Sequence, residues 1–371
     1  MAKRRQGMEL GSGANVVAGP SYLASYYSPY SSLSPHPLYG SSLGKSLGIR
    51  MDSMIHKPSS YRWLGSPTLQ WKDAERTKMK NSSVLLTHLD SLLLVLLILL
   101  ASPVAGHPTK KKTQFVLVHG SFHGAWSWYK LSTILQSWGH NVTALDMAAS
   151  GIDPIQPKTV SSAFQYFHPL TEFLAGLPSD ERVVLVGHSF GGIGVAAAME
   201  DFPEKISVGV FVTATMPGPN LTLSDILVEN GKQAPPPLDS HYVYDDGEDK
   251  PPTSIIVGSL TLAKHLYSLS PPEDLTLATM LVRSLPLFKI NDSKFKFTRE
   301  RFGSVKRAFV VTEKDLAAPK KFQMWMIENN PPDITVEIRG SDHMAMVSKP
   351  LELAHGLQHI VQQCSLLDFS S

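Results

Sequence analysis

The chain has 371 residues, of which 43% are hydrophobic and 18% charged, which is enough apolar material for a substantial core. Residues 113–371 hold twenty Lys and Arg against twenty-seven Asp and Glu, and this acidic balance argues against a nucleic-acid partner. The single cysteine, Cys364, excludes an intrachain disulfide and a cysteine-based metal cluster, and no metal site is predicted.

The first 78 residues are rich in Ser, Tyr, Gly and Pro and show little periodic apolar pattern. Ten Lys and Arg stand against four Asp and Glu in this segment. Such a composition is typical of a disordered tail or of a targeting extension with transit-peptide character. Residues 1–78 are therefore predicted to lie outside the folded part.

Residues 79–106 have the three parts of a secretory signal peptide: a basic start at Lys80, an unbroken apolar run at 92–100 and small residues at 101–106. Either translation begins at Met79 and the peptide is cleaved, or residues 84–105 form a signal anchor, close to the roughly 20 residues that cross a bilayer. The expected location is the secretory pathway, or a membrane reached only through 84–105. A plastid, or the cytoplasm if the N-terminal region is absent, is the alternative.

From residue 107 onward, short apolar strands alternate with helices, which predicts an α/β fold with a mainly parallel sheet and helices on both faces. Strands are expected at 115–118, 142–145, 183–186, 208–213, 308–311 and 335–338, and helices at 124–138, 161–177, 191–199, 319–329 and 349–363. Residues 217–300 break this alternation with a triple proline at 235–237 and helix-like stretches at 260–269 and 272–281. We expect this insertion to form a lid over the site, within one domain at 107–371.

The pentapeptide Gly-His-Ser-Phe-Gly at 187–191 lies between a predicted strand and a small-residue helix. This is the nucleophile-elbow pattern, in which flanking glycines let strand and helix approach closely and the serine is exposed at the sheet edge. Ser189 is the predicted nucleophile.

A serine hydroxyl needs an adjacent base that is itself held by a carboxylate, and in this fold class the chain order is Ser, acid, His. His343, just after the last predicted strand, is the predicted base. Asp315 follows the strand at 308–311 and is the predicted acid, with Glu313 as its rival. Asp342, beside the histidine, is assigned to a turn.

An oxyanion hole needs two backbone N–H donors. Phe190, directly after the nucleophile, should supply one, and Ser121, in the His-Gly-Ser-Phe-His-Gly loop at 119–124, should supply the other. Residues expected to contact substrate flank these motifs or lie in the lid. They are His123, His188, Leu266, Tyr267 and Met344.

These motifs resemble the plant methylesterase family of α/β-hydrolases, which includes salicylic acid-binding methylesterases, polyneuridine-aldehyde esterase and the related hydroxynitrile lyases. The resemblance covers about 115–360 and is carried by FVLVHG at 115–120, HGAW at 123–126, VLVGHSFGG at 184–192 and DHMAM at 342–346. It implies hydrolysis of small methyl esters, such as methyl jasmonate, methyl indole-3-acetate or methyl salicylate, through an acyl-enzyme and without a cofactor. It places the triad on Ser189, Asp315 and His343, and it leaves a homodimer open.

Two other functions remain as alternatives. Hydroxynitrile lyases of this family carry a Lys after the catalytic His and a Thr after the His of the first motif. Met344 and Gly120 stand at those positions here, so cyanide would lack a cation to receive it. A non-catalytic ligand receptor would have no need of an intact triad. The lid also lacks the Trp of the salicylate-binding type, so a strict preference for methyl salicylate is not expected.

Overall fold

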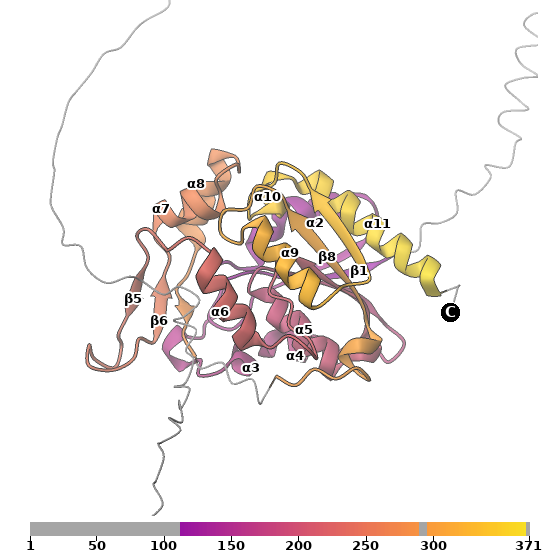
Figure 1. Ribbon diagram of the computed structural model, residues 1–371, viewed down its shortest axis with the longest axis horizontal. Helices are drawn as coiled ribbons and strands as arrows, with labels where there is room; N and C mark the ends of the chain where they lie inside the picture. The colour runs from indigo at the N-terminus through magenta and orange to yellow at the C-terminus, as the bar shows by residue number, and fades with distance from the viewer. Residues whose placement is uncertain (1–111, 289–294, 369–371) are drawn as a thin grey trace, which may run out of the picture. The chain divides into compact units, whose positions relative to one another are not determined.

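The computed structural model describes residues 112–288 and 295–368 (Figure 1). Its main sheet has six strands in the order β2-β1-β3-β4-β8-β9, and every neighbouring pair is parallel. The strands are β1 (Gln114–Val118), β2 (Asn141–Leu145), β3 (Val183–His188), β4 (Ile206–Val212), β8 (Lys306–Thr312) and β9 (Ile334–Ile338). The predicted α/β fold is confirmed.

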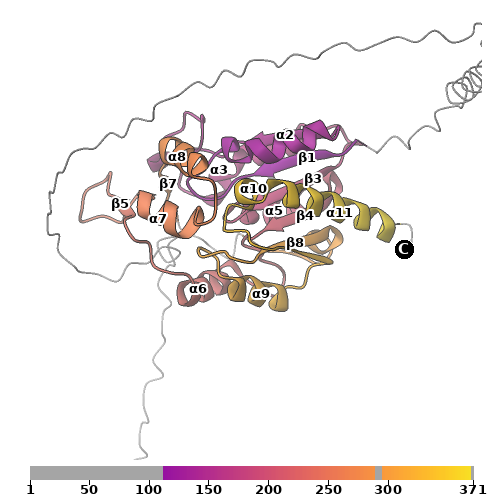
Figure 2. The same cartoon turned by 90° about the horizontal axis from the view of Figure 1, so that it is seen from above.

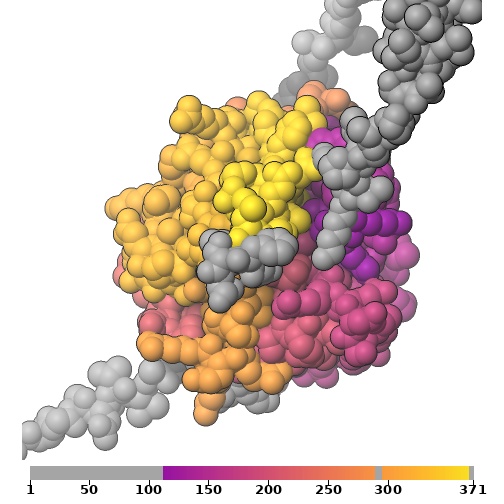
Figure 3. Space-filling view, turned by 90° about the vertical axis from the view of Figure 1, so that its right-hand side faces the viewer, coloured from indigo at the N-terminus to yellow at the C-terminus, as the bar shows by residue number. Residues whose placement is uncertain are grey.

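Helices cover both faces of this sheet (Figures 1 and 2). α2 (Tyr129–Ser137) and α11 (Pro350–Asp368) pack against each other, so segments from the two ends of the domain lie side by side (Figure 3). α5 (Gly191–Asp201) lies across β1, β3 and β4 on the other face, with α4 (His168–Ala175) packed on α5. The remaining helical segments outside the insertion are η2 (Ala125–Trp128), η3 (Pro157–Thr159), α3 (Ala163–Tyr166), η4 (Pro203–Lys205), η7 (Phe302–Ser304), α9 (Lys320–Asn329) and α10 (Ala345–Ser348).

The helix expected at 161–177 is divided into α3 and α4, which meet at Phe167. Pro169 in the first turn of α4 has no N–H to donate to the preceding turn, so a continuous helix cannot form there. The two short helices still bury Tyr166 and Leu170 against the core.

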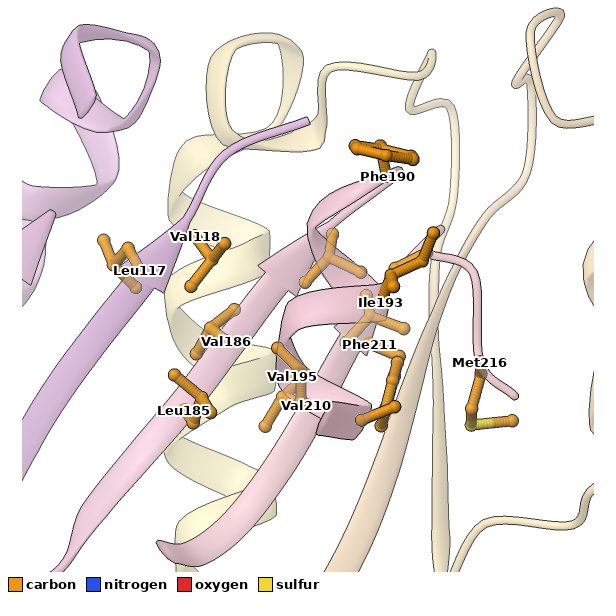
Figure 4. Packing of buried hydrophobic residues seen from close by; sticks show 14 of the residues in the cluster. Leu117, Val118, Leu185, Val186, Phe190, Ile193, Val195, Val210, Phe211 and Met216 are labelled. Carbon is orange, nitrogen blue, oxygen red and sulfur yellow. The ribbon is translucent and has the colours of Figure 1, made fainter. Parts of the chain in front are cut away.

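The centre of the core lies between β3, β4 and α5 (Figure 4). Val186 and Phe211 from the strands and Ile193 and Val195 from the helix are fully buried there. A Cβ at Gly187 would lie 2.5 Å from Val195 Cγ2, so the glycine lets α5 approach the end of β3 closely. This close approach positions the turn between them.

The insertion between β4 and β8 combines helices with a second, antiparallel sheet of order β5-β6-β7. Its elements are α6 (Leu223–Gln233), β5 (His241–Val243), β6 (Ser254–Ile256), α7 (Ser259–Thr261), η5 (Leu262–Leu266), α8 (Pro272–Leu281) and β7 (Leu285–Pro286). The two helix-like stretches expected at 260–269 and 272–281 correspond to α7–η5 and α8. The small sheet was not predicted, because strands of two or three residues carry no periodic signal.

The predicted extension at 1–78 and the predicted signal segment at 79–106 lie outside the described residues. Within 112–288 and 295–368, no helix is both long and apolar enough to cross a membrane.

Candidate active site

Ser189 occupies the turn between β3 and α5 in a left-handed backbone conformation, with φ +52°. This conformation costs a non-glycine residue about 1–2 kcal/mol. Three backbone hydrogen bonds hold it: Ser189 N–H donates to the Val212 carbonyl (3.2 Å), and the Ser189 carbonyl accepts from Gly192 (3.1 Å) and Thr215 (3.0 Å). The nucleophile predicted from the sequence is thus fixed at the carboxyl end of the sheet.

Glycines on both sides of this turn make room for the first loop. A Cβ at Gly191 would lie 2.6 Å from the His119 carbonyl oxygen, and one at Gly120 would lie 2.8 Å from His188 Nδ1. Both distances are too short for any side chain, so the loop after β1 can reach the elbow only with glycine at these positions.

His343 lies in the turn after β9, and its Nδ1–H donates to Asp315 Oδ2 over 2.8 Å. Glu313, the rival acid, instead accepts a hydrogen bond from the Gly340 backbone (2.8 Å), which lowers the pKa of that carboxyl. The structure therefore brings His343 and Asp315 together, and it places Glu313 on a neighbouring turn.

Four further donors hold the Asp315 carboxylate. The hydroxyls of Thr213 and Thr312 donate to Oδ2 over 2.7 and 2.9 Å, and the backbone N–H groups of Ala317 and Ala318 donate to Oδ1 over 2.8 and 2.7 Å. Because these donors lie at the end of β8 and in the segments directly after β4 and β8, the carboxylate is fixed at the edge of the sheet. The Asp315 carboxylate can therefore orient His343, because these hydrogen bonds keep it from rotating.

His188, inside the elbow motif, supports the loop that carries His343. Its Nε2–H donates to the His343 carbonyl over 2.9 Å, and the two rings lie in tilted contact, with 4.7 Å between centroids and an interplanar angle of 57°. Burial, and then the nearby charge of His343, hold the pKa of His188 well below its ordinary value. His188 is therefore neutral, and it fixes the position of the base through its backbone.

His123 connects the first loop to the insertion. A carbonyl can only accept, so His123 Nδ1–H donates to the Ser121 carbonyl (2.7 Å), and Nε2 must then accept from the Tyr267 hydroxyl (2.7 Å). Burial lowers the pKa of His123 to about 3, which matches a ring whose two nitrogens are both used in the neutral form.

Asp342 makes a second connection to the insertion. Its Oδ2 accepts from Leu269 N–H (2.9 Å) and from the Ser270 hydroxyl (2.8 Å), and its Oδ1 accepts from Met344 N–H (3.0 Å). From the sequence, Asp342 was predicted to form a turn alone. Its second role depends on residues more than 70 positions away, and a local motif carries no signal for such a contact.

A cavity of about 710 Å³, which includes its mouth to solvent, lies against Ser189 and His343. The main domain and the insertion both line it. The main domain contributes Ser121, Phe122, His123, His188, Ser189, Ala317, Ala318 and His343, and the insertion contributes Asn230, Ala234, Pro235, Pro237, Ser240, Val257, Thr261, His265 and Leu266.

Three of the five residues predicted to contact substrate line this cavity, and two do not. His123, His188 and Leu266 line it, whereas Tyr267 and Met344 do not. Tyr267 is turned to His123, and Met344 is fully buried in the core.

The two predicted oxyanion residues also differ in how they could act. Ser121 lines the cavity, and its buried hydroxyl has no hydrogen-bond partner in the part of the chain that the structure describes. The Phe190 side chain is buried against Tyr166 and Phe167 (Figure 4 shows its place in the turn). Only the Phe190 backbone, directly before α5, could therefore contact a ligand.

Sequence reasoning missed Asn230 and His265 in the cavity wall, as well as Ala317 and Ala318. One signal was available for Asn230, because it continues an apolar stripe of its helix. Over residues 112–288 and 295–368, no group of three His, Cys, Asp or Glu side chains could hold a metal ion.

Known proteins resemble this chain over the same residues. The sequence profile of the alpha/beta hydrolase family matches residues 115–355. Methyl jasmonate esterase 1 of Vitis vinifera is 49% identical over 259 residues, which is 69% of this chain and 99% of that protein. Methylesterase 1 of Arabidopsis thaliana is 47% identical over 249 residues, or 66% of this chain and 94% of that protein.

A solved structure agrees with these relatives. Tomato methylketone synthase I, complexed with 2-tridecanone, aligns with a TM-score of 0.65 at 47% identity and covers 68% of this chain and 98% of that one. The matched region contains the whole elbow, the turn that carries the base and the insertion between them. The chain belongs to the alpha/beta hydrolase family and, within it, to the plant methylesterases.

Proposed function

We propose that the protein hydrolyses the methyl esters of small carboxylic acids, with Ser189 as nucleophile, His343 as base and Asp315 as the acid that orients the base. The observation that carries the proposal is the hydrogen bond between Asp315 and His343, because His343 lines the same cavity as Ser189. The names of the relatives, a methyl jasmonate esterase and a methylesterase, support methyl esters as the substrate class.

The geometry supports a two-step acyl transfer. Because His343 Nδ1–H is bonded to Asp315, the Nε2 lone pair can take the Ser189 proton as Oγ attacks the ester carbonyl. Backbone N–H groups of Ser121 and Phe190 would stabilise the oxyanion. His343 then protonates the leaving methoxide, methanol departs, and a water molecule activated by His343 hydrolyses the acyl-enzyme to the free acid.

In the described residues the Ser189 hydroxyl makes no hydrogen bond. Its contact with His343 Nε2 is therefore expected to form when substrate binds, as catalytic hydrogen bonds commonly tighten in the Michaelis complex. The acid and base, by contrast, are already bonded in the free protein.

Hydroxynitrile lyase chemistry finds less support. A side chain at position 120 would collide with His188, and Met344 is buried with no charge to offer cyanide. The likeness to a methylketone synthase shows that proteins named for another reaction share this fold, so the assignment depends on the triad.

The test is hydrolysis of p-nitrophenyl acetate and of methyl jasmonate, methyl indole-3-acetate and methyl salicylate by the full chain and by Ser189→Ala. We expect the substitution to lower kcat by about 10⁶, since the triad acts as a unit. Activity of the variant within tenfold of the wild type would contradict the proposal. An unchanged thermal unfolding curve is the control for the fold.

A further inference from the structure

Asn230 breaks an otherwise apolar stripe on α6. Leu223, Ile226 and Leu227 form the buried side of this helix, and Asn230 continues it at the seventh position from Leu223. Helical periodicity calls for an apolar residue there. A carboxamide stands in its place with only 3% of its surface exposed, and it lines the cavity of Ser189.

The Asn230 amide has no hydrogen-bond partner among residues 112–288 and 295–368. The two hydroxyl side chains of the same wall are already engaged. Ser240 Oγ accepts from Gly258 N–H and donates to Thr261 Oγ1, which in turn donates to Asp239. The capacity to bind a polar ligand group is therefore concentrated at Asn230 on this wall.

His265 shares the wall and also has no partner within the described part of the chain. It is only half-buried, however, so water can satisfy its ring nitrogens. Asn230 is only 3% exposed, and its amide, which has no partner among the described residues, lines the cavity. A ligand in the cavity could therefore supply a hydrogen bond that the described residues do not provide to this amide.

We infer that Asn230 is a specificity-determining residue that hydrogen-bonds a second polar group, a ketone oxygen or a ring N–H, on the acyl part of the ester. The inference rests on the proposed function. The ester carbonyl lies at Ser189, and the acyl group fills the space beside Ala234, Pro235 and Pro237. Since a carboxamide both donates and accepts, Asn230 can bind either kind of group.

The test compares pairs of methyl esters that differ in one polar group. Methyl (3-oxocyclopentyl)acetate is paired with methyl cyclopentylacetate, and methyl indole-3-acetate with methyl 1-methylindole-3-acetate. For at least one pair, the wild type should show kcat/KM about tenfold higher for the polar member, the effect of one hydrogen bond. In Asn230→Leu, which keeps a similar shape, that ratio should fall to about one.

A merely structural role for Asn230 would lower both members of a pair equally and leave the ratio unchanged. Glu229→Leu, on the same helix but outside the cavity lining, is the matched control and should keep the wild-type ratio. Equal ratios in wild type and Asn230→Leu for both pairs, with p-nitrophenyl acetate still hydrolysed, would overturn the inference alone. A wild type that hydrolyses no ester at all would instead overturn the proposed function.

Discussion

The loops at the carboxyl edge of the main sheet and the insertion between β4 and β8 line the same cavity, but they differ in hydrogen bonding and in polarity. In the loops, Asp315 accepts five hydrogen bonds and both ring nitrogens of His123 are engaged. The insertion presents mainly apolar groups, with Asn230 unpaired among the described residues. We therefore propose that the hydrogen-bonded loops hold the reacting groups in place, while the insertion contributes to the choice of substrate.

For this comparison, the largest predicted effect comes from a substitution in the loops that leaves the insertion unchanged. Asp315→Asn should lower kcat by about 10⁴, because the amide no longer holds the His343 tautomer or stabilises the imidazolium. Glu313→Gln makes the same chemical change two residues away and should leave kcat within about twofold, since the Glu313 carboxylate contacts the Gly340 backbone and Lys314 rather than His343. Steady-state hydrolysis of p-nitrophenyl acetate measures both. The reverse ranking would move the acid to Glu313.

A second prediction concerns the junction between the two regions. Asp342→Ala should destabilise the protein by on the order of 3 kcal/mol, because donors from Leu269, Ser270 and Met344 lose their charged acceptor. Ser270→Ala removes one donor only and should cost less. Urea unfolding gives the free energies. If Asp342→Ala were neutral, the insertion would not depend on this contact.

The last prediction is a pH dependence that tests whether His123 is held neutral. In the folded protein the pKa of His123 is about 3, below its ordinary value of 6.5. Below pH 6.5 this side chain therefore binds a proton in the unfolded chain but stays neutral in the folded one. The free energy of unfolding should therefore be highest above about pH 6.5 and fall by up to about 1.4 kcal/mol per pH unit toward pH 3. Unfolding free energies at pH 7, 6 and 5 should show a steeper slope for the wild type than for His123→Gln. Parallel slopes would mean that His123 is not held neutral.

Sequence reasoning worked best where local pattern and topology coincide. Apolar strands followed by glycine-flanked motifs predicted β1, β3 and the Ser189 elbow, because parallel strands bring their carboxyl ends to one edge. Asp315 and His343 could be located by chain order, after β8 and β9 respectively. Their hydrogen bond then follows from the neighbouring positions of these strands in the sheet.

The insertion was less predictable, for physical reasons. β5, β6 and β7 are too short to show alternation, and their pairing joins residues 11 to 32 positions apart in the chain. Tyr267 was expected to contact substrate because it lies in an apolar stretch, yet its hydroxyl is bonded to His123. Side-chain bonds between distant segments leave no trace in local periodicity.

The left-handed backbone of Ser189 has a consequence for how such a protein evolves. Glycine adopts φ +52° without steric penalty, so a chain selected for stability alone would gain by replacing its nucleophile with glycine. Serine at this position is therefore kept at a standing cost of about 1–2 kcal/mol. A relative that abandoned hydrolysis would be free to recover that stability, and a glycine at the elbow would mark the loss of the reaction.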